Sequence, residues 1–268
     1  DFTKSEDATN AVNYIDGKLM IGQNTYATIG DTNDAQQVFA EAAKENTALK
    51  FSKDATQAVL YIKGNQTLGD AGAVYVNGAM ADAALKAEAT NVAVGSFIAR
   101  DNTITMVDAG ATEKKAALSG VKKVDIADKA KLYIRDAKGD TTYHILTDDG
   151  KAKLNIANNG WEKTDNLLTT NMALVGLQGK LSDDKSTFDV VTTNKSVTAV
   201  YGDSLVAPDV IDAANLGKNS KAKALVGKMT NEEVLAGKAR QADALNGVAN
   251  MVALSGASYA TFAASNML

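Results

Sequence analysis

The sequence predicts a mainly β fold, in which many short strands of similar length are followed by a further all-β module and a helical segment. Short β-branched or aromatic runs alternate with Gly, Asn and Asp turns up to about residue 203. The 268 residues include 21 Gly but one Pro, Pro208, which suits strands separated by tight turns. After Pro208 the composition shifts to Ala, Asn, Lys and Leu, which indicates helices.

Residues 1–140 are predicted to hold the repeated strands. The expected strands are residues 11–15, 18–21, 25–29, 56–62, 73–76, 91–98, 103–107, 121–126 and 131–134. Their similar lengths are typical of solenoid rungs, in which stacking supplies the core and the ends need caps. No exact sequence repeat is visible, and an antiparallel β-sandwich is the competing interpretation.

Two segments interrupt the strands. Residues 33–46 have apolar side chains at helical spacing behind Asp31 and Asp34, which predicts an inserted amphipathic helix. We expect this helix to cover an open end or a face of the sheets, and a binding role is the less favoured alternative. The alanine-rich residues 80–89 predict either a short helix or a wide loop.

Residues 141–203 are predicted to form an all-β module. Thr141–Thr147 is a strand closed by a turn at Asp148-Asp149-Gly150, and Asn158-Asn159-Gly160 predicts a tight hairpin turn just before the only tryptophan, Trp161. Further strands are expected at residues 167–169, 172–175, 185–191 and 196–201.

The order of these residues resembles the C-terminal part of type V autotransporter passengers. The matching residues are Tyr143, Ile145, Leu146, Thr147, Trp161, Asn166, Leu167, Leu168, Thr169, Thr170, Phe188, Val190 and Val191. The resemblance implies a right-handed parallel β-helix (solenoid) that ends in an autochaperone-like cap. It also implies which apolar residues form the folding cap: Tyr143, Ile145, Leu146, Trp161, Leu167, Leu168 and Phe188.

Residues 204–268 are predicted to be a helical linker. Short helices are expected at residues 209–216 and 221–226, and Thr230-Asn231-Glu232-Glu233 has the pattern of a capping box before a longer helix. The small-residue run at 242–257 resembles the linker that precedes the membrane β-barrel of autotransporters. That barrel is therefore an expected partner and would lie outside these 268 residues.

The sequence offers little for catalysis or metal binding. His144 is the only histidine, no Gly-x-Ser-x-Gly motif occurs, and there is no cysteine. Acid pairs at 148–149 and 183–184 could bind Ca²⁺ only if loop carbonyls converged on them, and solvated turn acids are the favoured interpretation. A net charge of −4 argues against nucleic acid as a partner. No catalytic, cofactor or metal site is expected.

The resemblance implies a non-enzymatic surface passenger fragment that acts as an adhesin or stalk, with the cap promoting folding after export across the outer membrane of a Gram-negative bacterium. Expected partners are its own β-barrel, a host or neighbouring cell surface, or further copies of itself. The alternatives are a self-associating envelope or filament subunit and a polysaccharide-active β-helix enzyme. Asp1-Phe2-Thr3-Lys4 is too polar to be a signal peptide, and no apolar run is long enough for a membrane helix.

Overall fold

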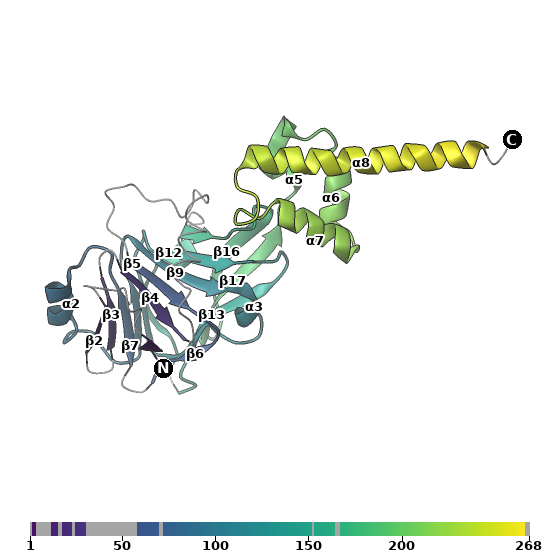
Figure 1. The fold of residues 1–268 in the computed structure, drawn as a ribbon. Helices are drawn as coiled ribbons and strands as arrows, with labels where there is room; N and C mark the ends of the chain where they lie inside the picture. Colours follow the sequence, from purple (N-terminus) through teal and green to yellow (C-terminus); the bar gives the residue numbers. More distant parts are fainter. Residues whose placement is uncertain are drawn as a thin grey trace. The chain divides into compact units, whose positions relative to one another are not determined.

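The computed structural model describes residues 2–3, 12–15, 18–22, 25–30, 58–69, 72–151, 153–163 and 167–265. It divides the chain into two compact units (Figure 1). The sheet unit comprises residues 1–171 and 175–193, and the helical unit comprises residues 172–174 and 194–268. Strands do build the first unit, but the helices make the chain mixed α/β rather than mainly β. The predicted helix at 33–46 lies outside the described residues.

Three sheets, named A, B and C, make up the sheet unit. Sheet A has the order β1 (Phe2–Thr3), β4 (Thr25–Ile29), β5 (Ala58–Ile62), β9 (Thr103–Asp108), β12 (Lys131–Arg135) and β15 (Leu168–Thr169). Sheet B has the order β2 (Val12–Ile15), β3 (Lys18–Ile21), β7 (Ala73–Val76), β8 (Ser96–Ala99), β11 (Lys123–Ile126) and β14 (Asn155–Asn159). Sheet C has the order β6 (Gln66–Thr67), β10 (Leu118–Val121), β13 (Thr142–Asp148), β17 (Thr187–Asn194) and β16 (Val175–Leu181).

Parallel pairing dominates these sheets. All neighbours from β4 to β15 in sheet A, from β3 to β14 in sheet B and from β6 to β13 in sheet C are parallel. The antiparallel sandwich that competed at the sequence level therefore does not describe this unit. From β8 to β15, successive strands visit sheets B, A and C in a fixed cyclic order.

Because of the cyclic order, buried residues of neighbouring strands lie next to one another across each sheet. In sheet A, Leu60 pairs with Thr105, Thr105 with Leu132, and Leu132 with Leu168. The three leucines and the threonine are buried, so the inward-facing side chains of neighbouring strands form one continuous core. Thr105 is a polar exception, since its buried hydroxyl has no hydrogen-bond partner among the described residues.

Among the described residues of the sheet unit, short helices interrupt the strands: α2 (Asp82–Glu88), α3 (Ala109–Thr112) and α4 (Gly160–Lys163). Residues 80–89 were predicted to form either a short helix or a wide loop, and the structure shows the helix, α2. Its Leu85 is fully buried and packs in one cluster with Met20 of β3 and Tyr75 of β7. Gly22 permits this contact, because a Cβ there would lie 2.3 Å from the carbonyl oxygen of Met80.

The predicted hairpin turn at Asn158-Asn159-Gly160 is wrong. Both asparagines belong to β14, which pairs in parallel with β11, and Gly160 begins α4. A Cβ on Gly160 would lie 2.4 Å from the carbonyl oxygen of Ala127. Glycine is therefore needed here for a close backbone approach and not for the positive φ angle of a hairpin turn.

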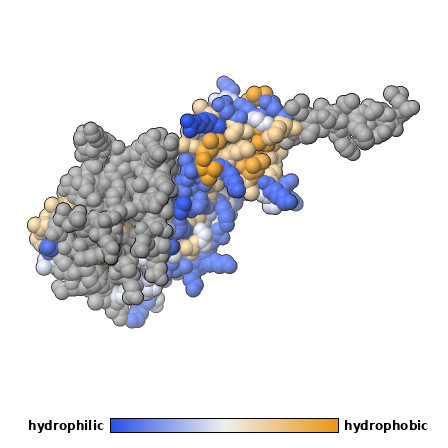
Figure 2. All heavy atoms as spheres, in the orientation of Figure 1, coloured by the Kyte–Doolittle hydropathy of each residue, from blue (hydrophilic) through white to orange (hydrophobic). Residues whose placement is uncertain are grey.

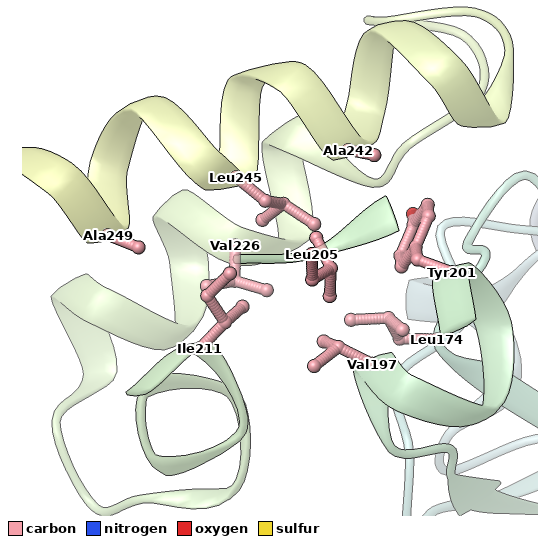
Figure 3. Close-up of a cluster of buried hydrophobic side chains, with 9 residues drawn as sticks. All are labelled: Leu174, Val197, Tyr201, Leu205, Ile211, Val226, Ala242, Leu245 and Ala249. Carbon is pink, nitrogen blue, oxygen red and sulfur yellow. The ribbon is translucent and has the colours of Figure 1, made fainter. Parts of the chain in front are cut away.

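The helical unit contains α5 (Val197–Tyr201), the 3-10 helix η2 (Gly202–Ser204), α6 (Pro208–Leu216), α7 (Ser220–Met229) and α8 (Lys238–Ser265). Its core gathers one to three side chains from each of α5, α6, α7 and α8 together with Leu174 and Leu205 (Figure 3). Helix α8 contributes Ala242, Leu245 and Ala249, which follow the i, i+3, i+7 spacing of one helix face.

Three local predictions fail in this unit. Residues 172–174, expected to belong to a strand at 172–175, form a turn with an isolated bridge between Met172 and Asn231, and β16 begins only at Val175. Residues 196–201 are a helix and not a strand: the Ser196 hydroxyl accepts a hydrogen bond from the Ala199 amide, and Val197 and Tyr201 are buried four residues apart on one face. Thr230 does not open a helix. Its hydroxyl donates to the Val226 carbonyl and so closes α7, whereas α8 begins only after Gly237, whose φ is 86°.

Candidate functional site

All seven predicted folding-cap residues are buried, with side-chain exposures between 0% and 7%. They come from β13, α4, the residue before β15, β15 itself, and β17. The structure thus places Tyr143, Ile145, Leu146, Trp161, Leu167, Leu168 and Phe188 in the interior of the sheet unit. Burial makes them part of the core, and their role in guiding folding stays a prediction. Asn166, which belongs to the resemblance, lies outside the described residues.

The centre of this site is the Trp161 side chain. Its ring centroid lies 5.7 Å from that of Phe97 and 5.8 Å from that of Phe188, with interplanar angles of 52° and 42°. Such tilted pairs are a favourable arrangement for aromatic rings. Phe188 is in turn the cross-strand partner of Leu146. Trp161, Phe97, Phe188 and Leu146 therefore connect α4 with sheets B and C, and we call them the aromatic cluster.

Sequence reasoning missed Phe97 as a member of the aromatic cluster. Phe97 lies in β8, where a strand was predicted, but its contact with Trp161 spans 64 positions of the sequence. Leu168, another of the seven, pairs with Leu132 in sheet A. The seven predicted residues thus line several layers of one core.

Glycine allows the backbone to pass close to Trp161. A Cβ on Gly179 of β16 would lie 2.3 Å from the Trp161 carbonyl oxygen and 3.0 Å from Cζ of Phe188. Gly160, next to Trp161, is equally close to the turn that follows β11. Both positions require a residue without a Cβ, because the tryptophan backbone is enclosed on two sides.

Packing rather than polar contacts holds the aromatic cluster. The indole Nε1 of Trp161 and both amide atoms of Asn159 are buried and have no hydrogen-bond partner among the described residues. Leaving such groups unpaired costs about 1–3 kcal/mol each. The packing of the rings must therefore be strong enough to offset that cost.

The single histidine is a cross-strand tie between β13 and β17. His144 and Asp189 are register partners, and Nδ1 lies 2.9 Å from the Asp189 carboxylate. Thr187 donates to the other oxygen of the same carboxylate at 3.2 Å. In the described part of the chain no hydroxyl is hydrogen-bonded to Nε2 of this ring, so the pair does not form a serine-type triad there.

Three of the four turn acids accept hydrogen bonds from their own turns. Asp148 and Asp149 each accept a backbone amide two residues further on, and Asp184 accepts from Ser182 and from both the amide and the hydroxyl of Ser186. These bonds, led by the Ser186 hydroxyl, lower the pKa of Asp184 below its usual value. Among the described residues, no group of three or more His, Asp and Glu side chains could hold a metal ion.

A polar network in the helical unit surrounds Gln241, which is fully buried. The Tyr201 hydroxyl donates to Gln241 Oε1 at 2.7 Å, and Gln241 Nε2 donates to Glu232 at 3.0 Å and to the Leu235 carbonyl at 2.7 Å. Burial, with a smaller contribution from the Glu232 charge, raises the pKa of Tyr201 well above its usual value. The network thus fixes the start of α8 against α5.

Asn246 joins α8 to the loop before α6. Its Oδ1 accepts from the Val206 amide and its Nδ2 donates to the Ser204 carbonyl, both at 2.8 Å. An asparagine amide can satisfy a backbone donor and a backbone acceptor at once, which no apolar residue can do. The loop that holds Val206 and Ser204 is therefore fixed by a side chain about forty residues away.

Exposed apolar side chains gather in the helical unit. Among the described side chains, the large hydrophobic residues with the greatest exposure there are Val206, Val210, Leu216, Leu225, Val234 and Met251. The sheet unit contributes only Val94 to the same group of described residues. Figure 2 shows hydrophobic side chains of the helical unit at the surface on the face that is drawn.

Comparison of the chain with protein-family models, with curated proteins and with solved structures gives no match. None of the described helices is both long enough and apolar enough to span a membrane. The functional interpretation therefore depends on the fold, the aromatic cluster and the helical unit.

Proposed function

We propose that the sheet unit is a right-handed parallel β-helix and that the chain is the C-terminal part of a non-enzymatic type V autotransporter passenger. In this proposal it serves as an adhesin or stalk on the surface of a Gram-negative cell. The observation that carries the proposal is the strand order. Each strand from β9 to β15 lies in the next sheet of a three-sheet cycle, and each strand from β11 to β15 pairs in parallel with the strand one cycle earlier. Crossovers between parallel strands are almost always right-handed, which supports the proposed hand.

The end of the parallel stack supports a capping role. In sheet C, β13 pairs on one side with parallel β10 and on the other with antiparallel β17. Strand β17 forms a hairpin with β16, closed by the hydrogen bond from the Ser182 amide to the Thr187 carbonyl. This antiparallel hairpin covers the free edge of β13, the last parallel strand of sheet C, which would otherwise accept another strand. The hairpin packs on the aromatic cluster: Phe188 of β17 contacts the Trp161 ring, and Gly179 of β16 lies close to the Trp161 backbone.

The helical unit supports a linker role. Helix α8 has 28 residues, and no charged residue follows Asp243 in the sequence. A 28-residue helix is about 42 Å long. Ala and Ser are the commonest residues in the sequence of its second half. We therefore propose that α8 leads toward a membrane β-barrel that belongs to the same protein.

Protease treatment of intact cells tests the location. The cells are those that produce the protein naturally, and an antibody against the sheet unit follows the chain. We expect added protease to degrade the chain on intact cells while a periplasmic marker stays whole. Full protection until the cells are lysed would contradict surface exposure.

Refolding tests the cap. The 268-residue chain is unfolded in urea and diluted, and the yield of native protein is compared for wild type, Phe188→Ala and the exposed-site control Val94→Ala. We expect Phe188→Ala to refold more slowly and in lower yield, because the β16–β17 hairpin then packs less well on β13. Equal refolding rates for Phe188→Ala and Val94→Ala would contradict a folding role for the cap.

A further inference from the structure

The first two strands run against the direction of the strands on which they pack. Strand β1 pairs antiparallel with β4, with Phe2 opposite Ile29 and Thr3 opposite Thr28. Strand β2 pairs antiparallel with β3 in sheet B. On their other edges, β4 and β3 pair in parallel with β5 and β7. The change of direction therefore occurs in two sheets at the same end of the stack.

These antiparallel strands occupy the positions that a preceding parallel rung would need. A strand has two hydrogen-bonding edges, and both edges of β3 and of β4 are in use. At the other end of the unit, β17 does the same to β13 in sheet C. An unpaired edge is a template for another strand, from the same chain or from a second copy.

We propose that β1 and β2 form an N-terminal cap that ends the parallel stack. Further parallel strands then cannot extend sheets A and B from β4 and β3. A second copy of the chain therefore cannot continue the parallel stack on β4 and β3 themselves. The remaining edge in sheet C on this side, β6, is only two residues long, which is too short to recruit a strand efficiently. The inference depends on strand pairing and not on export.

Engineered cysteines test the pairing in the folded chain. Thr3 and Thr28 are register partners, and opposite residues of antiparallel strands have Cα atoms about 5 Å apart, within the range of a disulfide. The chain has no cysteine of its own, so a bridge in the double variant Thr3→Cys/Thr28→Cys is unambiguous by mass spectrometry. The matched control is Thr3→Cys/Thr25→Cys, because Thr25 lies three residues further along β4, about 10 Å away.

We expect the first pair to form an intramolecular disulfide at least about tenfold faster than the control under mild oxidation. Equal rates in the two pairs, or faster closure of the control, would overturn the proposed cap. The comparison does not require either strand to be disrupted, so it does not depend on a destabilised variant.

Removing the cap tests its consequence. Asn13 lies within β2, and Asn13→Pro deletes a backbone donor and disfavours the pairing with β3. We expect the mean mass of this variant, measured by light scattering, to rise at least about twofold with concentration relative to wild type and to Asn13→Thr. A folded Asn13→Pro variant with an unchanged mass would overturn the proposal. If Asn13→Pro does not fold, the cysteine pairs decide.

Discussion

Truncation of Trp161 is the sharpest test of the packing described for the sheet unit. The side chain is 1% exposed and contacts two rings with centroid distances under 6 Å. Replacing a buried tryptophan with alanine costs about 3–5 kcal/mol, which includes the loss of the transfer energy and the cavity left behind. We expect Trp161→Ala to lower the free energy of unfolding by about 4 kcal/mol.

The magnitude is large relative to the stability of such a unit. Native domains are stable by about 5–15 kcal/mol, so the change would remove a quarter or more of the total. In a unit of this size, each kcal/mol corresponds to about 2–4 °C in Tm, which gives an expected drop of about 12 °C. The loss of the unpaired Nε1 group partly offsets the cost, because that group is buried without a partner in the described structure.

The assay is urea unfolding followed by far-UV circular dichroism, since the variant has no tryptophan fluorescence. Lys163→Ala is the matched control, because Lys163 lies in the same helix but is exposed and, in the described structure, donates a hydrogen bond to the Asn158 side chain. We expect the control to change stability by less than about 0.5 kcal/mol. A loss below about 1 kcal/mol in Trp161→Ala, or one equal to the control, would refute the argument that the aromatic cluster holds this part of the core.

Three further predictions follow from single contacts. Gly179→Ala places a Cβ 2.3 Å from the Trp161 carbonyl oxygen, so we expect a loss of about 1–3 kcal/mol in the same urea assay and a red shift of the tryptophan fluorescence; an unchanged midpoint would contradict the close approach. Asn246→Ala removes two hydrogen bonds to the loop before α6, so hydrogen exchange of the loop amide that Asn246 binds should accelerate by about tenfold, while a rate like that of wild type would show that the loop holds itself. The folded-state pKa of Asp184 is below its unfolded value of 3.8, so its contribution to stability is present above that value and is lost as the pH falls toward the folded-state pKa. Asp184→Asn should therefore lower stability at pH 6 and reduce its loss between pH 5 and pH 2, whereas Asp183→Asn, at a carboxylate with no hydrogen bond in the described structure, should not.

The sequence was enough to locate most strands. Runs such as those of β5, β9 and β12 are rich in Val, Ile and Tyr and end at Gly, Asn or Asp, and local propensity suffices to recognise such runs. The sequence could not show which strands pair, because most parallel partners are separated by strands of the other two sheets and no exact repeat marks the register. For the same reason Phe97 could not be assigned to the aromatic cluster.

The failures of local reasoning have two different physical causes. At 196–201 the β-branched residues favour a strand, but Ser196 caps a helix whose Val197 and Tyr201 fill the core of the helical unit, so tertiary packing overrides propensity. At Asn159-Gly160 the turn chemistry was right for a hairpin, but glycine also serves where two backbones meet. A sequence pattern cannot distinguish these two uses of glycine.

The path of the chain through the helical unit has a consequence for cleavage. Residues 172–174 belong to that unit, although the chain then returns to β16 and leaves the sheet unit again only after Thr193. Leu174 is buried in the helical core, the Ala173 amide donates to the Thr230 carbonyl, and the Lys195 amide donates to the Leu174 carbonyl. Cleavage just after Lys195 would separate the helices from the rest of the chain. Residues 172–174 would remain packed against these helices although they belong covalently to the other fragment. The two fragments should therefore co-purify until a denaturant separates them.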